Sequence, residues 1–245
     1  KDVHPLCNNY LEAAEQAGIP FNEDYNTGEM EGAAIYQITT RKGFRASASR
    51  AYFHPIKNRS NIDLSLRSQV TRVLFEGKKA NGVEFIKNGK LKQVKAHCEV
   101  IICGGAINSP QVLQNSGIGS SALLSKFDIP VIHHSPNVGE NLQDHMGASI
   151  YYQSKVPTLN QSLGSFWGKL NVGIDYILRR KGPLSLSVNQ GGGFVKAQNN
   201  SEFPDTQIYF SPVSYTRAPT GTRPLMSPDP FPGFLLGYNP CKPTS

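Results

Sequence analysis

One stretch decides the expected fold: residues 100–119 read VIICGGAINSPQVLQNSGIG. The apolar, β-branched run 100–103 predicts a buried strand. Two glycines follow this run, and a glycine has no Cβ that would keep a bound group away from the main chain. Ser109 is a suitable helix cap and Pro110 suits a first helical turn. The stretch therefore predicts a strand, a tight crossing and a helix, which many α/β proteins use without any cofactor.

The composition indicates a soluble globular protein. The chain has 245 residues, of which 38% are hydrophobic and 18% charged, enough for one large domain or two small ones. Its formal net charge of +7 comes from scattered basic residues. This scatter argues against a nucleic-acid partner and leaves a mild attraction to anionic membranes open. The four cysteines form no CxxC pair and no histidines have zinc-ligand spacing, so we expect neither a metal site nor a disulfide framework.

The periodicity of apolar residues predicts helices and strands along the whole chain. Helices are expected over 5–17, 47–55, 110–116, 121–127 and 166–179. Strands are expected over 33–40, 62–67, 69–76, 82–87, 91–96, 100–103, 130–133, 148–153, 191–196 and 206–210. Asn88-Gly89 between two alternating runs predicts a hairpin, so the strands between 62 and 96 are expected to form an antiparallel β-meander.

The pattern changes after Asp144-His145-Met146, where alternating strands with long loops begin. Such strands are typical of antiparallel sheets with one open face. We expect helix 166–179 to cover this sheet with a stripe that consists of Leu170, Ile174, Ile177 and Leu178. The Pro-rich segment 217–232 is expected to be a surface loop near a pocket mouth.

Two stretches resemble sequence motifs of a known protein family. The segment 105–119 resembles the second signature of the glucose-methanol-choline (GMC) oxidoreductases at every constrained position. Those positions are Gly105, Ala106, Ser109, Pro110, Val112, Leu113, Ser116, Gly117, Ile118 and Gly119. The segment 136–145 (PNVGENLQDH) resembles the VG-x-N-L-x-D-H word of the same family. With shorter matches at 24–26, 43–53 and 82–84, the similarity covers about residues 20–150.

The resemblance implies FAD as the cofactor. Similar segments in the family line the adenosine side of FAD, which assigns Gly104 and Gly105 to the cofactor site. A valine at the place of Val70 contacts the adenine through its backbone N–H and C=O. In the family a histidine base removes the hydroxyl proton while hydride passes from carbon to flavin N5, and the flavin supplies the redox chemistry. That histidine and its His or Asn partner are expected beyond Ser245, and the pyrophosphate loop is expected before Lys1, so the chain by itself is expected to be inactive.

His145 invites a catalytic interpretation with Asp144 beside it. Adjacent side chains usually point apart, so the two are poor partners for acid–base chemistry, and we interpret His145 as a hydrogen-bonded structural histidine. The absence of a Gly-x-Ser-x-Gly motif argues against the α/β-hydrolases.

The resemblance implies an incomplete α/β chain with a Rossmann-like FAD-binding domain, including an antiparallel β-meander, and part of an α+β substrate domain with an antiparallel sheet. Residues 1–55 are expected to lead from the substrate or cap region into the flavin domain. Residues 56–146 are assigned to the FAD-binding domain and 147–245 to the substrate-binding domain.

The implied activity is that of a choline-dehydrogenase-like enzyme that oxidises choline or another small alcohol. The electron acceptor (oxygen, a quinone or another compound) and the oligomeric state stay open. The parent protein is expected in the cytoplasm or peripherally on a membrane. Two alternatives remain: a non-redox lyase of the same family, and a basic binding module without a cofactor.

Overall fold

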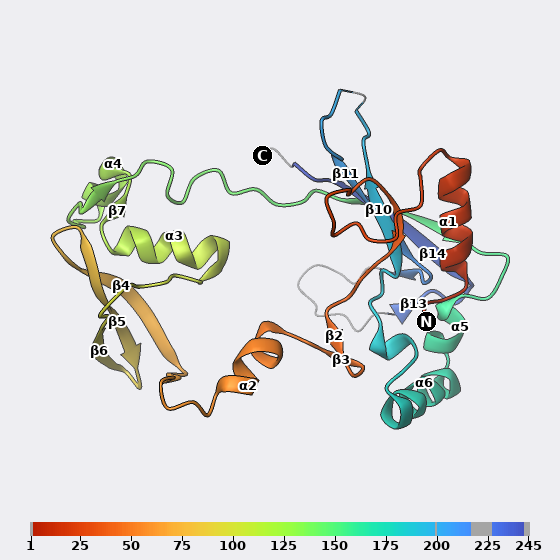
Figure 1. The fold of residues 1–245 in the computed structure, drawn as a ribbon, viewed down its shortest axis with the longest axis horizontal. Helices are drawn as coiled ribbons and strands as arrows, with labels where there is room; N and C mark the ends of the chain where they lie inside the picture. Colours follow the sequence, from red (N-terminus) through yellow and green to blue (C-terminus); the bar gives the residue numbers. More distant parts are fainter. Residues whose placement is uncertain (1, 199, 217–226, 243–245) are drawn as a thin grey trace. The chain divides into compact units, whose positions relative to one another are not determined.

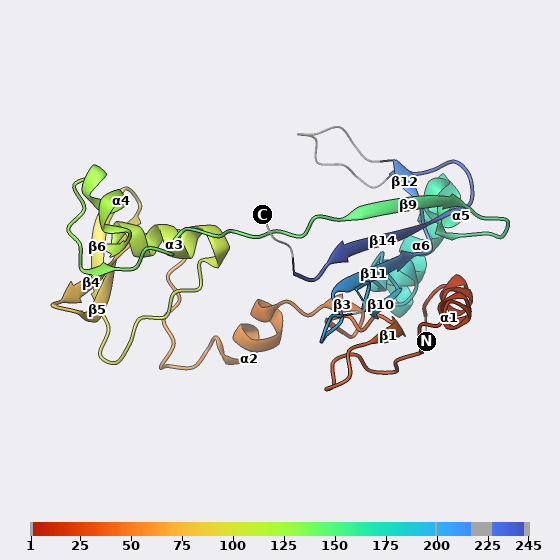
Figure 2. The same cartoon turned by 90° about the horizontal axis from the view of Figure 1, so that it is seen from above.

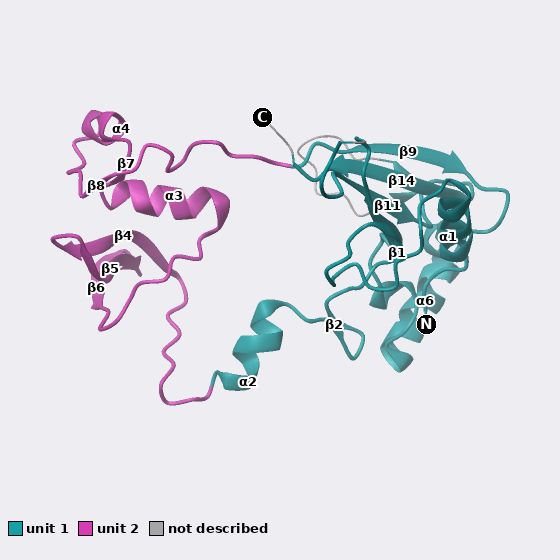
Figure 3. Cartoon of the chain, turned by 45° about the horizontal axis from the view of Figure 1, so that its top comes forward, with its two compact units in different colours: residues 1–57, 145–244 teal, residues 58–144, 245 magenta. Residues whose placement is uncertain are grey.

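The chain divides into two compact units. The computed structural model describes residues 2–198, 200–216 and 227–242. Unit 1 combines residues 1–57 with 145–244, and unit 2 consists of residues 58–144 (Figure 3). Each unit has β-sheet of its own.

Unit 1 is built on a five-stranded antiparallel sheet with the strand order β1-β10-β11-β14-β9 (Figure 2). The strands are β1 (Gly32–Ile35), β9 (Ala148–Gln153), β10 (Gly191–Val195), β11 (Thr206–Ser211) and β14 (Gly233–Pro240). The expected pairing of 191–196 with 206–210 is confirmed, with Gly192 opposite Tyr209. Because β1 pairs with β10, residues 1–57 group with residues 145–244 in this unit.

Two short hairpins accompany the sheet of unit 1. Strands β2 (Thr40–Arg41) and β3 (Phe44–Arg45) form one, and β12 (Tyr215–Thr216) pairs with β13 (Ser227–Pro228) in the other. The strand expected over 33–40 therefore ends at Ile35 and a new one begins at Thr40. Most of the Pro-rich loop expected over 217–232 lies outside the described residues.

Helix α1 (Leu6–Gln16) packs against the sheet of unit 1 (Figure 1). The ring of Tyr10 stacks on that of Phe210 in β11, with centroids 4.9 Å apart. Cys7 and Ala14 are buried in the same layer. Stacked aromatic rings contribute beyond their buried area, so this contact is a main element of the core.

The described part of unit 1 has five further helical segments, of which only α6 is longer than two turns. They are the π-helical turn η1 (Ser49–Phe53), α2 (His54–Ile56), α5 (Leu159–Gly164), α6 (Phe166–Arg179) and the 3-10 turn η2 (Pro183–Ser185). Pro55 lies inside α2 and does not end it, because a proline in a first helical turn displaces no intrahelical hydrogen bond. The Ser165 hydroxyl caps α6 by accepting the Gly168 N–H at 3.0 Å.

The expected packing of α6 on the sheet is wrong. Leu170 and Ile174 are 41% and 46% exposed, and Ile177 and Leu178 are exposed further, to 66% and 76%. Helix α6 instead packs on α5 and η2. The apolar stripe was predicted correctly as a pattern, but α6 turns it outward.

Unit 2 contains the predicted β-meander. Its strands are β4 (Ser68–Glu76), β5 (Lys79–Lys87) and β6 (Lys90–Lys95), in that order. The Asn88-Gly89 turn is confirmed, with φ angles of +53° and +71°. Arg72 of β4 forms a two-pronged contact with Glu84 of β5 at 3.0 Å, and this hydrogen bonding lowers the pKa of the Glu84 carboxyl.

The strand expected over 62–67 is absent from the described fold. Arg67 has φ +52°, which breaks the extended backbone immediately before β4. Leu64 and Leu66 are 58% and 66% exposed, so these alternating apolar side chains are not buried in a core within the described residues. The meander therefore has three strands and not four.

Four elements follow the meander in unit 2: α3 (Gly105–Asn115), β7 (Ile118–Gly119), α4 (Ser121–Lys126) and β8 (His133–His134). Strands β7 and β8 pair in parallel. The strand expected over 130–133 corresponds to β8, which is shorter and begins only at His133. The buried strand expected over 100–103 is not formed, and Ile101 is 74% exposed. A strand of this kind needs a hydrogen-bonding neighbour on each side, and none of the described strands pairs with it.

Helix α3 begins earlier than the sequence suggested. Ser109 and Pro110 lie inside it rather than at its start. The Ser109 hydroxyl accepts the N–H of Gly104 at 3.0 Å, so it reaches back to the amide that precedes the helix. This back-bond explains how a typical capping residue comes to stand in the second turn.

Among the described residues, no helix combines the length and apolar character needed to cross a membrane. Within the same residues, no three His, Cys, Asp or Glu side chains gather as a metal site would require.

Candidate functional site

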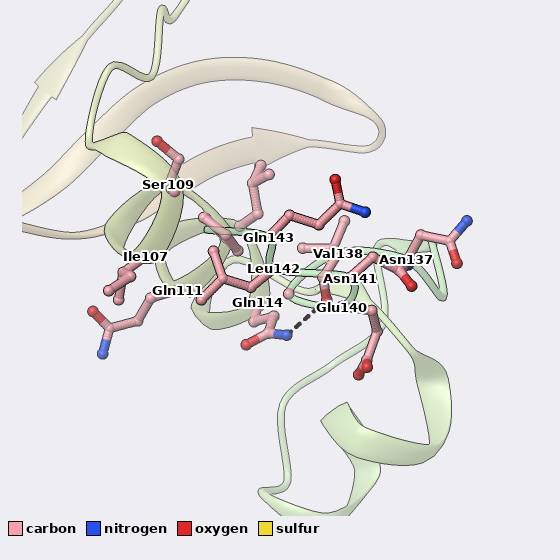
Figure 4. Close-up of a pocket in the computed structure, with 14 residues that line it drawn as sticks. Ile107, Ser109, Gln111, Gln114, Asn137, Val138, Glu140, Asn141, Leu142 and Gln143 are labelled. Atoms are coloured by element: carbon pink, nitrogen blue, oxygen red, sulfur yellow. Dashed lines mark hydrogen bonds between the residues drawn. The ribbon is translucent and has the colours of Figure 1, made fainter. Parts of the chain in front are cut away.

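A groove of about 630 Å³ runs between α3 and the loop 137–143 of unit 2 (Figure 4). Its lining residues are Ala106, Ile107, Ser109, Pro110, Gln111, Leu113, Gln114, Asn137, Val138, Gly139, Glu140, Asn141, Leu142 and Gln143. One wall thus comes from the segment 105–119 and the other from the segment 136–145. The fold brings the two stretches with family resemblance together in one concave surface.

Gln114 connects the two walls. Its side-chain amide Nε2 donates to the carbonyl of Val138 at 2.9 Å (Figure 4). The next residue, Gly139, has φ +87°, and a Cβ there would lie 2.5 Å from Gln114 Nε2. Only glycine combines this backbone conformation with such a close approach. The residues Gln114 and Gly139 were not singled out from the sequence, although the glycine belongs to the VG-x-N-L-x-D-H word.

The predicted residues Gly104 and Gly105 stand at the N-terminal end of α3, next to the groove. Gly105 is the first helical residue and has φ +83°. No atom lies within 4 Å of the position that a Cβ would take on Gly105. At Gly104, in contrast, a Cβ would lie 3.1 Å from the Ser109 nitrogen. The backbone of Gly105 is therefore open to a ligand, while Gly104 is fixed by the helix itself.

The predicted residue Val70 lies in β4, one of the two edge strands of the meander. Its backbone is locally irregular, because Val70 pairs with Phe85 but Arg72 already pairs with Glu84. One extra residue on β4 at this point is the signature of a β-bulge, a device that re-aims the backbone. Within the described part of unit 2, Val70 is not a lining residue of the groove.

Ser116 ties α3 to the free edge of β4. Its hydroxyl accepts the N–H of Val73 at 2.8 Å and donates to the carbonyl of Val112 at 2.5 Å. Ser116 is only 7% exposed. The hydroxyl therefore satisfies a strand amide that β5 does not pair, and it fixes the strand that carries Val70 against the helix that begins at Gly105.

His145 lies in unit 1 and takes part in a local hydrogen-bond cluster. Its Nδ1 lies 3.1 Å from the carbonyl oxygen of Pro240 and 3.3 Å from the side-chain Nδ2 of Asn239, so it can donate to the first or accept from the second according to the tautomer. These contacts fix the ring at the end of β14, which agrees with the structural interpretation of this histidine.

The fold is that of a flavin-dependent oxidoreductase. It matches a solved FAD-dependent oxidoreductase from Chaetomium thermophilum with a TM-score of 0.72 and 27% sequence identity, over 78% of this chain and 34% of that one. The family description "GMC oxidoreductase" fits residues 1–147. The chain therefore belongs to the GMC oxidoreductase family, as its two sequence motifs predicted.

Curated relatives extend the similarity beyond residue 147. Human mitochondrial choline dehydrogenase is 40% identical over 223 residues, which is 90% of this chain and 38% of the human protein. The Pseudomonas putida protein named alcohol dehydrogenase [acceptor] is 39% identical over 216 residues, covering 87% of this chain and 39% of the relative. The chain thus spans less than half the length of these relatives.

Proposed function

We propose that this chain forms part of an FAD-dependent oxidoreductase that acts on the CH–OH group of a small alcohol. The groove of unit 2 carries this proposal, because its two walls are the two stretches that identify the family. The similarity to choline dehydrogenase and to an alcohol dehydrogenase supports a choline-like or other small alcohol as the substrate.

The residues of unit 2 fit one part of an FAD site. The open main chain at Gly105 allows a flat group to approach the helix start, where the first N–H groups of α3 point outward. The edge of β4 offers backbone donors and acceptors near Val70, because an edge strand pairs on one side only. Gly104, Gly105 and Val70 would hold the adenosine part of the cofactor. When bound, FAD supplies the hydride acceptor for alcohol oxidation.

We assign the substrate-facing surface to unit 1. A pocket of about 280 Å³ on its sheet is lined by Tyr25, Tyr36, Gln37, Ile38, Ser187, Asn189, Gln207 and Tyr209. The ring centroids of Tyr25 and Tyr36 are 5.6 Å apart, and those of Tyr36 and Tyr209 are 6.0 Å apart. Clustered aromatic faces attract organic cations, so this surface fits a small alcohol that carries an ammonium group.

The cluster is internally hydrogen-bonded. Tyr209 donates its hydroxyl proton to Gln207 Oε1 at 2.6 Å, and Gln207 Nε2 donates to the Tyr36 hydroxyl at 3.3 Å. Burial raises the pKa of Tyr36. Tyr36 therefore stays neutral, and the hydrogen bonds hold Tyr36, Gln207 and Tyr209 in one arrangement, which a rigid recognition surface needs.

The test uses the natural protein that contains this chain. Purified protein is expected to show visible flavin absorbance, and an alcohol added without oxygen is expected to bleach it. Flavin that no alcohol bleaches would favour the non-redox lyase, and protein without flavin would favour the binding module. Tyr209→Ala is expected to raise the KM for choline while flavin content stays unchanged. An unchanged KM would remove the assignment of the tyrosine surface.

A further inference from the structure

Helix α6 presents its bulky apolar side to the outside of unit 1. The side that packs inward is formed by its half-buried residues, which are Gly168, Val172, Gly173, Asp175 and Tyr176. Six large apolar side chains, each at least 41% exposed, form the α6 stripe: Phe166, Trp167, Leu170, Ile174, Ile177 and Leu178. At 3.6 residues per turn they occupy about one third of the helix circumference. The stripe is thus a continuous apolar face about 20 Å long.

A basic cluster lies at the C-terminal end of the same helix. It consists of Arg41, Lys42, Arg45, Arg50 and Arg180. The first four surround a pocket of about 270 Å³ with Phe44 in its wall. The guanidinium groups of Arg180 and Arg50 lie 4.5 Å and 4.8 Å from the centroid of the Phe44 ring. Among the ion pairs of the described residues, none involves a member of this cluster.

Direct contacts attach the basic cluster to the C-terminal end of α6. The Tyr176 hydroxyl of α6 donates to the carbonyl of Gly43, the turn residue between β2 and β3, at 3.0 Å. The Arg180 guanidinium also lies 5.2 Å from the Tyr176 ring. Arg180 is the C-cap of α6 and follows Leu178 by two positions, so the cluster lies at the C-terminal end of the apolar stripe.

We propose that the α6 stripe and the basic cluster form a docking surface for an anionic lipid bilayer. A helix that lies in the membrane interface has Trp, Phe and Leu on one face and Lys or Arg beside it. The stripe provides the apolar face, and the cluster provides unpaired positive charge for lipid headgroups. Cation stacking on Phe44 holds two of the guanidinium groups in place before any lipid arrives. The proposal is independent of flavin binding.

The experiment is co-sedimentation of the natural, full-length protein with phospholipid vesicles at low and high salt. Binding is expected to vesicles of phosphatidylcholine with phosphatidylserine, and to weaken with salt. Vesicles of phosphatidylcholine alone are expected to bind far less. Each basic side chain near an anionic surface contributes about fivefold, so Arg41→Gln/Lys42→Gln/Arg45→Gln should weaken binding about 100-fold. Trp167→Ser/Ile177→Ser should also reduce binding, with flavin content unchanged.

A matched control removes the same charge from exposed positions of unit 2: Lys78→Gln/Lys79→Gln/Lys126→Gln. This control is expected to bind nearly as well as the unmodified protein. Equal loss in both triple variants would overturn the proposal, because general charge would then explain the binding. Unmodified protein that stays in the supernatant would also overturn it. In that case a lower oligomeric state of Trp167→Ser/Ile177→Ser would identify a second copy as the occupant of the stripe.

Discussion

The contact between Gly139 and Gln114 allows a quantitative test of how the groove is built. Gly139→Ala places a Cβ 2.5 Å from Gln114 Nε2, so the Gln114 amide must move and lose its hydrogen bond to Val138. A left-handed backbone costs a non-glycine residue about 1–2 kcal/mol. The lost hydrogen bond costs about 1 kcal/mol more. The expected local destabilisation is therefore about 2–3 kcal/mol.

Gln114→Ala provides the matched control. It removes the same hydrogen bond, at a cost of about 1 kcal/mol, but it also makes room for the new Cβ. The double variant should then be no less stable than Gly139→Ala alone. Simple addition of the two single effects would predict about 1 kcal/mol more destabilisation, so the expected coupling is about 1 kcal/mol.

The assay is the urea dependence of amide hydrogen exchange in peptides from α3 and from the loop 137–143, followed by mass spectrometry. This readout reports the opening of the groove itself, which global unfolding would average with unit 1. Strict additivity of the two variants would refute the proposed link between the walls. A destabilisation of Gly139→Ala below about 1 kcal/mol would refute the strain argument as well.

The remaining predictions concern the cofactor site, two tyrosines of unit 1 and Asp205. In the natural protein, Gly105→Val should deplete bound FAD far more than Val70→Ala, because it puts a β-branched residue at φ +83° where the main chain is open; equal flavin absorbance per protein would contradict both assignments. Tyr10→Phe should raise the free energy of unfolding of unit 1 by about 1 kcal/mol and so raise its urea midpoint, because among the described residues the buried Tyr10 hydroxyl has no hydrogen-bond partner. Tyr36→Phe, which loses bonds to Ile208 and Gln207, should lower that midpoint. Hydrogen bonds from Ser201 and the Ala197 N–H hold the pKa of Asp205 at about 2, against an ordinary value of 3.8. The ionised carboxylate therefore contributes fully to stability above pH 3.8, and this contribution is lost as the pH falls through about 2. Asp205→Asn should make the stability depend less on pH in this acid range, as measured by unfolding followed with circular dichroism.

Local signals predicted three strands of the meander and the long helix. Asn88-Gly89 specifies its own turn, because both residues tolerate a positive φ, and the flanking alternation specifies which side chains share a face. The apolar periodicity of residues 166–179 similarly located α6 within its chain segment. Such features depend on neighbours in the chain, so a sequence reveals them.

The errors concern features that depend on distant partners. The run 100–103 has strand composition, but a strand forms only where other strands pair with it. The stripe of α6 has the right period, yet period alone does not say which surface will cover it. In the groove, the role of Gln114 depends on a carbonyl that lies 24 positions further along the chain. The two family motifs located the walls of the groove, but the hydrogen bond between Gln114 and Val138 that joins the walls is seen only in the structure.

Unit 1 is formed from two chain segments, 1–57 and 145–244, and unit 2 lies between them in the sequence. This arrangement has a consequence for synthesis on the ribosome. Ile35 of β1 pairs with Gly191 of β10, and 156 positions separate them. At about 5–20 residues per second, β1 leaves the ribosome roughly 10–30 s before its partner strand. All of unit 2 emerges in that interval and can complete its meander first. During this time β1 exposes an unpaired edge, so the nascent chain is a natural client for chaperones until β10 arrives.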